Sequence, residues 1–230
     1  MNKLEQIEQQ YKFKYPELYH RLYNDKMLDG GEFGPNWHAT YWEKFKINPP
    51  LLLFANDIEL LEFNRKGNGT SVIEHIETLR DPNHYIPIKS EFTFIPFAST
   101  GGGDLYVFQL DKQCGDDVPI TLIPHDSDDA TILAKNLQDF IFRMLLECAR
   151  EIDENSRAND GDLKTNLFNM LRTHKPYLSK SQVAKVEEIY NRDLGLISMD
   201  ELSSTLRQEI GFDGLDKEFK YTSEDEDVLC

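Results

Sequence analysis

The chain has 230 residues and a formal net charge of −16, from 41 Asp and Glu against 25 Lys and Arg. This balance argues against a protein that grips nucleic acid, because such proteins carry basic patches that meet the phosphates. Hydrophobic residues make up 40% of the chain, as in ordinary folded proteins. No stretch approaches the roughly 20 apolar residues of a membrane span, and the polar start MNKLEQIEQQ has no secretory signal. We therefore expect a soluble α+β protein with neither membrane nor nucleic-acid partners.

The three cysteines give no sign of a structural bridge or a metal centre. Cys114, Cys148 and Cys230 are widely spaced and form no CxxC pair. Neither a disulfide framework nor a zinc site is indicated by such a pattern. We expect a cytoplasmic location and no cofactor.

The first half of the chain predicts two helices followed by less regular structure. Leu4, Ile7 and Tyr11 have helical spacing, and a second helix begins at Pro16 and ends before Gly30. Residues 30–50 combine Gly, Pro and four aromatic side chains, which indicates a packed irregular segment. Residues 51–54 are predicted as a short strand, followed by a possible helical stretch through residues 61–63.

The middle of the chain is typical of strands. Residues 92–98 and 104–110 are rich in aromatic and β-branched side chains, and the glycines at 101–103 suggest a hairpin turn between them. A third strand is expected over residues 118–123 and ends at Pro124, which has no N–H to donate to a ladder.

The strongest helical pattern follows these strands. Asp126, Asp128 and Asp129 are placed to accept the free N–H groups of a helix start, and the predicted helix then runs through Leu133 to Cys148. We expect a main domain at 1–152, a linker at 153–162, a helical extension at 163–215 and a disordered acidic tail at 216–230. The extension contains two capping-box patterns, Ser179-x-x-Gln182 and Ser198-x-x-Glu201.

Three motifs were weighed as chemical sites. The run Thr100-Gly-Gly-Gly-Asp104 precedes a strand rather than a helix, which favours a turn over a phosphate loop. His125-Asp126 fits either a strand-end histidine beside a capping aspartate or one part of a metal-dependent hydrolase site. The aromatic residues from Phe33 to Trp42 fit either packing or a ligand platform. No catalytic residue and no metal site are predicted.

Motifs across residues 1–150 resemble the SUKH superfamily. Tyr15-Pro16-x-x-Tyr19 stands where that family has Leu-Pro-x-x-Tyr, and Ile95-Pro96-Phe97-Ala98 precedes Gly103-Asp104-Leu105-Tyr106-Val107-Phe108. The pair His125-Asp126 and a helix containing Leu133-Ala134 and Phe140 follow in the same order. The superfamily includes bacterial immunity proteins and fungal cell-wall synthesis regulators.

This resemblance implies a non-enzymatic α+β domain, with a mainly antiparallel sheet and helices packed against it. It further implies a bacterial immunity protein that binds and occludes a cognate toxin, for which a basic nuclease would suit the acidic charge. The alternatives are a scaffold in cell-wall synthesis or signalling, and a metal-dependent hydrolase using His125 and Asp126. The oligomeric state stays open. The residues expected to face the toxin are Phe33, Trp37, Trp42, Asp126, Asp128 and Asp129.

Overall fold

The computed structural model describes residues 1–32, 34–55, 57–63, 71–81, 83, 87–150, 157–192 and 197–223. These residues form two compact units, each assembled from separate stretches of the chain. Unit 1 comprises residues 1–16, 59–136 and the segment from 214 onward, and unit 2 comprises residues 17–58 and 137–213. The expected α+β class is confirmed, with an antiparallel sheet in unit 1 and packed helices in unit 2.

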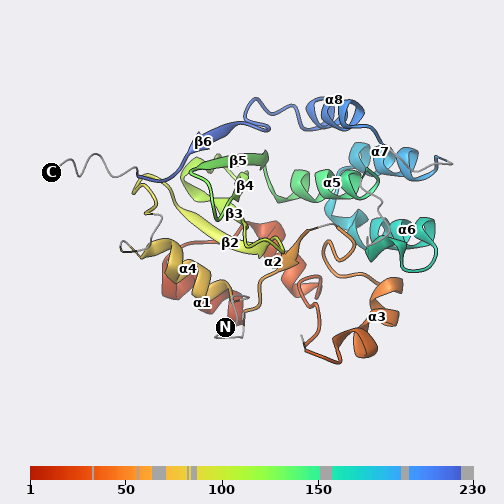
Figure 1. Cartoon of the computed structure of the whole chain (residues 1–230), viewed down its shortest axis with the longest axis horizontal. Coiled ribbons are helices and arrows are strands. Elements are labelled where there is room, and N and C mark those ends of the chain that lie inside the picture. The colour runs from red at the N-terminus through yellow and green to blue at the C-terminus, as the bar shows by residue number, and fades with distance from the viewer. Residues whose placement is uncertain are drawn as a thin grey trace. The chain divides into compact units, whose positions relative to one another are not determined.

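The described residues of unit 1 form a six-stranded sheet whose strands lie in chain order (Figure 1). Each strand pairs antiparallel with the next. The strands are β1 (Glu59–Leu60), β2 (Phe94–Ser99), β3 (Leu105–Gln109), β4 (Ile120–Ile123), β5 (Asp129–Ala134) and β6 (Glu218–Lys220). The predicted hairpin of β2 and β3 and the predicted third strand are both confirmed.

Two helices of unit 1, α1 (Lys3–Tyr11) and α4 (Val72–Arg80), are joined by polar contacts. The Tyr11 hydroxyl donates to the carboxylate of Glu77 at 2.7 Å, and Arg80 donates to the Tyr11 carbonyl. The predicted first helix is therefore confirmed. The sequence pattern did not reveal α4, which begins with Ser71 accepting a hydrogen bond from the Glu74 amide.

Both faces of the sheet are covered by apolar side chains. Val107 and Phe108 are neighbours on β3, so they point to opposite faces, and both are fully buried. Phe108 packs edge-on against Tyr15 at 5.9 Å between ring centroids. The other face carries a cluster of Phe94, Leu105, Val107, Ile123, Ala130 and Tyr221. This double burial explains why the sequence of β3 is almost continuously apolar.

Unit 2 is organised around α5 (Leu137–Cys148), which contacts four of its other helices. Gln182 donates to Asp139 at 2.7 Å, and the Tyr190 hydroxyl donates to the Leu145 carbonyl at 2.7 Å. Both bonds attach one of the predicted C-terminal helices, α7 (Lys180–Tyr190), to α5. The other helices are α2 (Glu17–Asn24), α3 (Trp37–Ile47), α6 (Leu163–His174), α7 (Lys180–Tyr190) and α8 (Met199–Ile210), with short 3₁₀ turns at Leu110–Lys112 in unit 1 and at Arg157–Asn159 and Lys175–Tyr177 in unit 2.

Several predictions in the first half of the chain are wrong. Residues 37–47 form α3 rather than an irregular segment, because their aromatic residues recur at helical spacing. Residues 51–54 form a buried turn rather than a strand, with Leu52 at a φ of 54°. The possible helix near residues 61–63 is replaced by β1 and the residues after it.

The second half of the chain also departs from prediction at two places. Residues 129–134 form β5 rather than the start of a helix, because they pair with both β4 and β6, and α5 begins only at Leu137. The expected disordered tail is corrected for residues 218–222, where β6 is followed by the buried Tyr221 and Thr222. Residues 224–230 lie outside the described residues.

The predicted domain limits at 152 and 162 remain a prediction, since residues 151–156 are not among those described. Within the predicted linker, residues 157–159 form a 3₁₀ turn with Ala158 buried.

The two predicted helix N-terminal caps of the C-terminal segment are present in the structure. Ser179 and Gln182 form the predicted capping box, and the Ser198 side chain accepts from the Glu201 amide.

Candidate functional site

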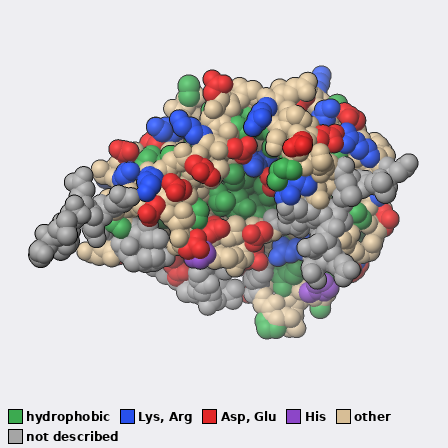
Figure 2. All heavy atoms as spheres, turned by 45° about the horizontal axis from the view of Figure 1, so that its top comes forward, with side chains coloured by type: hydrophobic (Ala, Val, Ile, Leu, Met, Phe, Trp, Pro, Cys, Tyr) green, Lys and Arg blue, Asp and Glu red, His purple; other side chains and the backbone are tan. Residues whose placement is uncertain are grey.

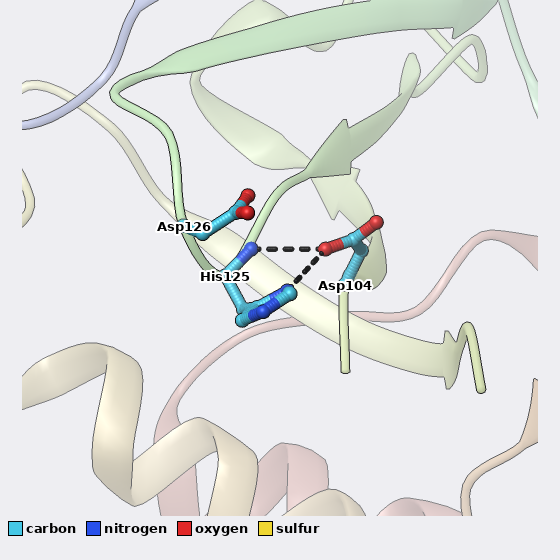
Figure 3. A group of neighbouring side chains, drawn as sticks. All are labelled: Asp104, His125 and Asp126. Carbon is cyan, nitrogen blue, oxygen red and sulfur yellow. Dashed lines mark hydrogen bonds and ion pairs between the residues drawn. The ribbon is translucent and has the colours of Figure 1, made fainter. Parts of the chain in front are cut away.

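Two signature segments of the sequence meet at one corner of the sheet in unit 1. Leu105, at the start of β3, pairs with Ile123, at the end of β4. This register places Asp104 beside His125, although the two residues are 21 positions apart in the chain. We refer to Asp104, His125 and Asp126 as the Asp–His corner (Figure 3).

The Asp104 carboxylate is held by both the backbone and the ring of His125. One oxygen, Oδ1, accepts from the His125 amide at 3.0 Å and lies 2.7 Å from the ring Nδ1. Figure 3 shows this carboxylate facing His125, with Asp126 at the next position along the chain. Two contacts to one oxygen fix the relative position of the two segments.

The turn before β3 prepares Asp104 for this contact. The Asp104 amide donates to the Thr100 hydroxyl at 2.9 Å, and the Thr100 amide donates to the Asp104 carbonyl at 2.8 Å. Gly103 has a φ of 101°, a backbone conformation that side-chain-bearing residues rarely adopt. The predicted glycine turn therefore has a clear local role, which is to aim Asp104 at the end of β4.

The electrostatics of the corner favour a protonated histidine. The hydrogen bond to Asp104 raises the pKa of His125. Desolvation opposes this effect, and the charges of Asp126 and Asp104 add smaller upward contributions. The side chains of His125 and Asp104 are 50% and 27% exposed. An exposed histidine beside carboxylates suits contact with another macromolecule better than chemistry in a closed pocket.

The same three residues are the group that could hold a metal ion within the described part of the chain. One ligand atom from each of Asp104, His125 and Asp126 lies within 4.8 Å of the others. One imidazole nitrogen and two carboxylates form a donor set that zinc or another transition metal accepts.

The predicted aspartates lie around this corner, in a loop rather than at a helix start. The β4–β5 loop comprises residues 124–128, and Asp129 is the first residue of β5. Asp126, Asp128 and Asp129 are all exposed. The structure therefore places the three predicted acidic residues at exposed positions in the β4–β5 loop and at the start of β5.

The predicted aromatic residues belong to unit 2, so each group is described by itself. Trp37 and Trp42 lie on α3 with their rings 6.1 Å apart, and Phe33 lies outside the described residues. The Trp37 indole donates to the Gly30 carbonyl at 2.6 Å, while the Trp42 indole donates to the carboxylate of Asp160. Trp42 is only 4% exposed and Trp37 is half-buried, so packing within unit 2 accounts for most of their surface. Their contact with a partner remains a prediction.

The pairing of Asp104 with His125 is the feature that sequence reasoning missed. In the sequence, Asp104 ends the glycine run and His125 begins the His-Asp pair, so the two residues belong to separate motifs. A signal was available, because two consecutive antiparallel strands place the residue before the first beside the residue after the second. Applied to strands 105–109 and 120–123, this rule brings the two motifs together.

Comparison with known proteins identifies the family to which this chain belongs. The chain matches the model of the SMI1 / KNR4 family (SUKH-1) over residues 2–143. The chain therefore belongs to this family, which confirms the resemblance seen in the sequence. Its members are generally non-enzymatic immunity or regulatory proteins. No match was found among curated proteins or among solved structures.

On the face drawn in Figure 2, charged side chains are spread rather than gathered into a single patch. Figure 2 shows acidic side chains interspersed with basic ones over the face that it presents. Among the described residues, no helix is both long and apolar enough to cross a membrane. The location of a binding surface must therefore be argued from particular residues and not from the net charge alone.

Proposed function

We propose that this chain is an immunity protein, which binds a toxic enzyme with a basic surface and blocks it by occlusion. The observation that carries this proposal is membership of the SUKH-1 family over residues 2–143. The formal net charge of −16 supports it, because an acidic inhibitor is drawn by long-range attraction to an enzyme that must itself bind phosphates. In this proposal the chain is not an enzyme.

The surface proposed for contact is the Asp–His corner together with the exposed aspartates beside it. Asp126, Asp128 and Asp129 present carboxylates that can take the place of nucleic-acid phosphates on a nuclease. The contact between Asp104 and His125 holds the start of this loop against β3, so part of the surface is fixed before binding. Such preorganisation reduces the entropy lost on association.

Affinity capture from native cell lysate tests the proposal. The tagged chain is used at low and at moderate salt, and bound proteins are identified by mass spectrometry. We expect a toxic enzyme with a basic binding surface in about equal molar amount, with weaker retention at higher salt because exposed charges are screened. Recovery of cell-wall synthesis or signalling proteins in its place would support a regulator of the SMI1/KNR4 kind.

A charge-matched pair of variants then tests the surface. One variant carries Asn at the three loop positions Asp126, Asp128 and Asp129, and the control carries Asn at three exposed aspartates elsewhere, Asp116, Asp200 and Asp213. Both variants lose three negative charges. We expect the loop variant to bind the captured enzyme about tenfold or more weakly than the control, since contacting charges contribute more than distant ones. Equal binding by the two variants would remove the loop from the interface.

A further inference from the structure

The last strand of the sheet comes from a part of the chain beyond the family match. The match ends at residue 143, whereas β6 spans Glu218–Lys220 and pairs with β5 on the edge of the sheet. We call residues 218–223 the C-terminal strap. Its residues pair in register with β5, Ala130 opposite Phe219 and Thr131 opposite Glu218. The strap therefore extends the family sheet by one strand.

The strap also reaches the loop that carries the proposed binding surface. The Tyr221 hydroxyl lies 2.8 Å from the Pro124 carbonyl and 3.0 Å from the Ser127 carbonyl, so one donor is shared between the two ends of the loop. The Tyr221 amide donates to the Asp128 carbonyl at 3.1 Å. The Thr222 hydroxyl donates to the Asp128 carboxylate at 2.8 Å.

The two strap residues that make these contacts are buried. Tyr221 is 2% exposed and Thr222 is 3% exposed, and the Tyr221 ring packs edge-on against Phe94. On its other side the strap is tied to residues 87–89, because the Lys89 amide donates to the Tyr221 carbonyl at 3.0 Å and the Ser223 amide donates to the Pro87 carbonyl at 2.9 Å. The Tyr221 hydroxyl is therefore held in place by groups that do not belong to the loop.

We propose that the C-terminal strap is a positioning element, which holds the β4–β5 loop in the conformation that the toxic enzyme recognises, with Tyr221 as the main positioning residue. This inference rests on the proposed function for the identity of the partner, but the hold on the loop can be measured without one. A loop fixed in advance binds its partner more tightly than the same loop moving freely, because less conformational entropy is lost on binding. The strap thus gives the C-terminal segment a role in recognition.

The first measurement is amide hydrogen exchange in the protein without partner. Tyr221→Phe removes the shared hydroxyl and keeps the ring against Phe94, so the sheet is expected to stay folded. We expect the amides of His125 and Asp129, which bond within the loop region, to exchange at least about threefold faster, while the amide of Val107 in β3 does not change. The matched control is Tyr11→Phe, which removes a hydroxyl bonded to Glu77 and should leave the loop unaffected.

A second pair of variants separates the hydrogen bond from side-chain size. Thr222→Val removes the hydroxyl that bonds to Asp128, whereas Thr222→Ser keeps it. We expect faster loop exchange in the valine variant and rescue in the serine variant. A loss of packing alone would produce the opposite order, because valine retains more of the threonine shape than serine does.

The binding measurement uses the toxic enzyme recovered by affinity capture. Tyr221→Phe changes no charge, so we expect about a fivefold or greater loss of affinity with an unchanged dependence on salt. Asp126→Asn is expected to lower both the affinity and the salt dependence, because it removes a charge from the surface. This contrast distinguishes a positioning residue from a contacting one.

The outcomes separate the two proposals. Loop exchange that does not change in Tyr221→Phe would overturn the positioning role, whatever partner is found. Faster exchange with undiminished affinity would also overturn it, while the immunity function would stand with its interface elsewhere. A captured enzyme that the wild-type chain binds but does not inhibit would contradict the immunity function, and the exchange result would still decide whether the strap holds the loop.

Discussion

Replacing His174 should release a buried turn in unit 2 and remove a specific pH dependence of stability. His174, the last residue of α6, is fully buried. Its Nε2 accepts from the Leu52 amide at 2.9 Å, and its Nδ1 lies 2.7 Å from the Met170 carbonyl. The ring is therefore neutral, with its proton on Nδ1. Leu52 has a positive φ of 54°, a strained conformation for a leucine. The hydrogen bond from its amide to His174 stabilises this conformation.

The expected magnitude follows from these contacts. His174→Ala leaves the buried Leu52 amide without its acceptor, which costs about 1–3 kcal/mol, and the lost packing of the ring brings the total to about 3–4 kcal/mol. Burial lowers the pKa of His174 from 6.5 to about 4, against an opposing effect of the Met170 carbonyl. This difference corresponds to about 3 kcal/mol of pH-dependent stability.

The sign of the pH effect is fixed by which state binds the proton. Between pH 6.5 and about 4 the unfolded chain protonates this histidine and the folded chain does not. The contribution of His174 is therefore fully present above pH 6.5 and is lost as the pH falls towards 4. His174→Gln keeps an acceptor for the Leu52 amide but cannot titrate, so its stability should fall less steeply with acidification.

Urea unfolding followed by tryptophan fluorescence is the suitable assay. Both tryptophans of the chain, Trp37 and Trp42, belong to unit 2, so the signal reports the unit that contains His174. Parallel pH profiles for wild type and His174→Gln would refute the argument that a buried neutral imidazole holds this turn.

Three further predictions follow from other features of the molecule. Gly103→Ala should destabilise the protein by about 1–2 kcal/mol in urea unfolding, because a side chain strains the turn at a φ of 101°. The same variant should bring the raised pKa of His125, followed by NMR, back towards its ordinary value. An unchanged stability and an unchanged pKa of His125 would contradict this prediction. Iodoacetamide should label the exposed Cys114 in the folded protein but Cys148 only after unfolding, since burial raises the pKa of that thiol, and peptide mapping checks this. Treatment with EDTA should leave stability and partner inhibition unchanged, whereas a loss of either would favour the metal-dependent alternative.

Local signals predicted the parts of the fold in which neighbours in sequence decide the structure. The first helix, the hairpin of β2 and β3, and the capping box at Ser179 all depend on residues a few positions apart. The strand β5 was missed because one of its partners, β6, lies more than 80 residues later in the chain. A helix start at Asp126 was plausible from the local pattern, and the distant pairing of residues 129–131 overrode it.

The candidate site was predicted in part for the same reason. Asp126, Asp128 and Asp129 are close in sequence, so their place in and directly after one loop follows from the sequence. The contact between Asp104 and His125 depends on the register of β3 and β4. The hydrogen bonds of Tyr221 to the loop depend on the C-terminal strap, which the composition of the tail did not predict. The acidic residues near the end of the chain suggested disorder, but the aromatic residues Phe219 and Tyr221 just before them are the ones that pack.

Titration of the captured enzyme with the purified chain measures whether the chain inhibits that enzyme by binding it. The toxic activity is measured against increasing amounts of wild-type chain and of the variant with Asn at Asp126, Asp128 and Asp129. We expect stoichiometric loss of activity near one chain per enzyme for wild type, and a much weaker effect for the variant. Full enzyme activity in the presence of saturating, bound wild-type chain would contradict it.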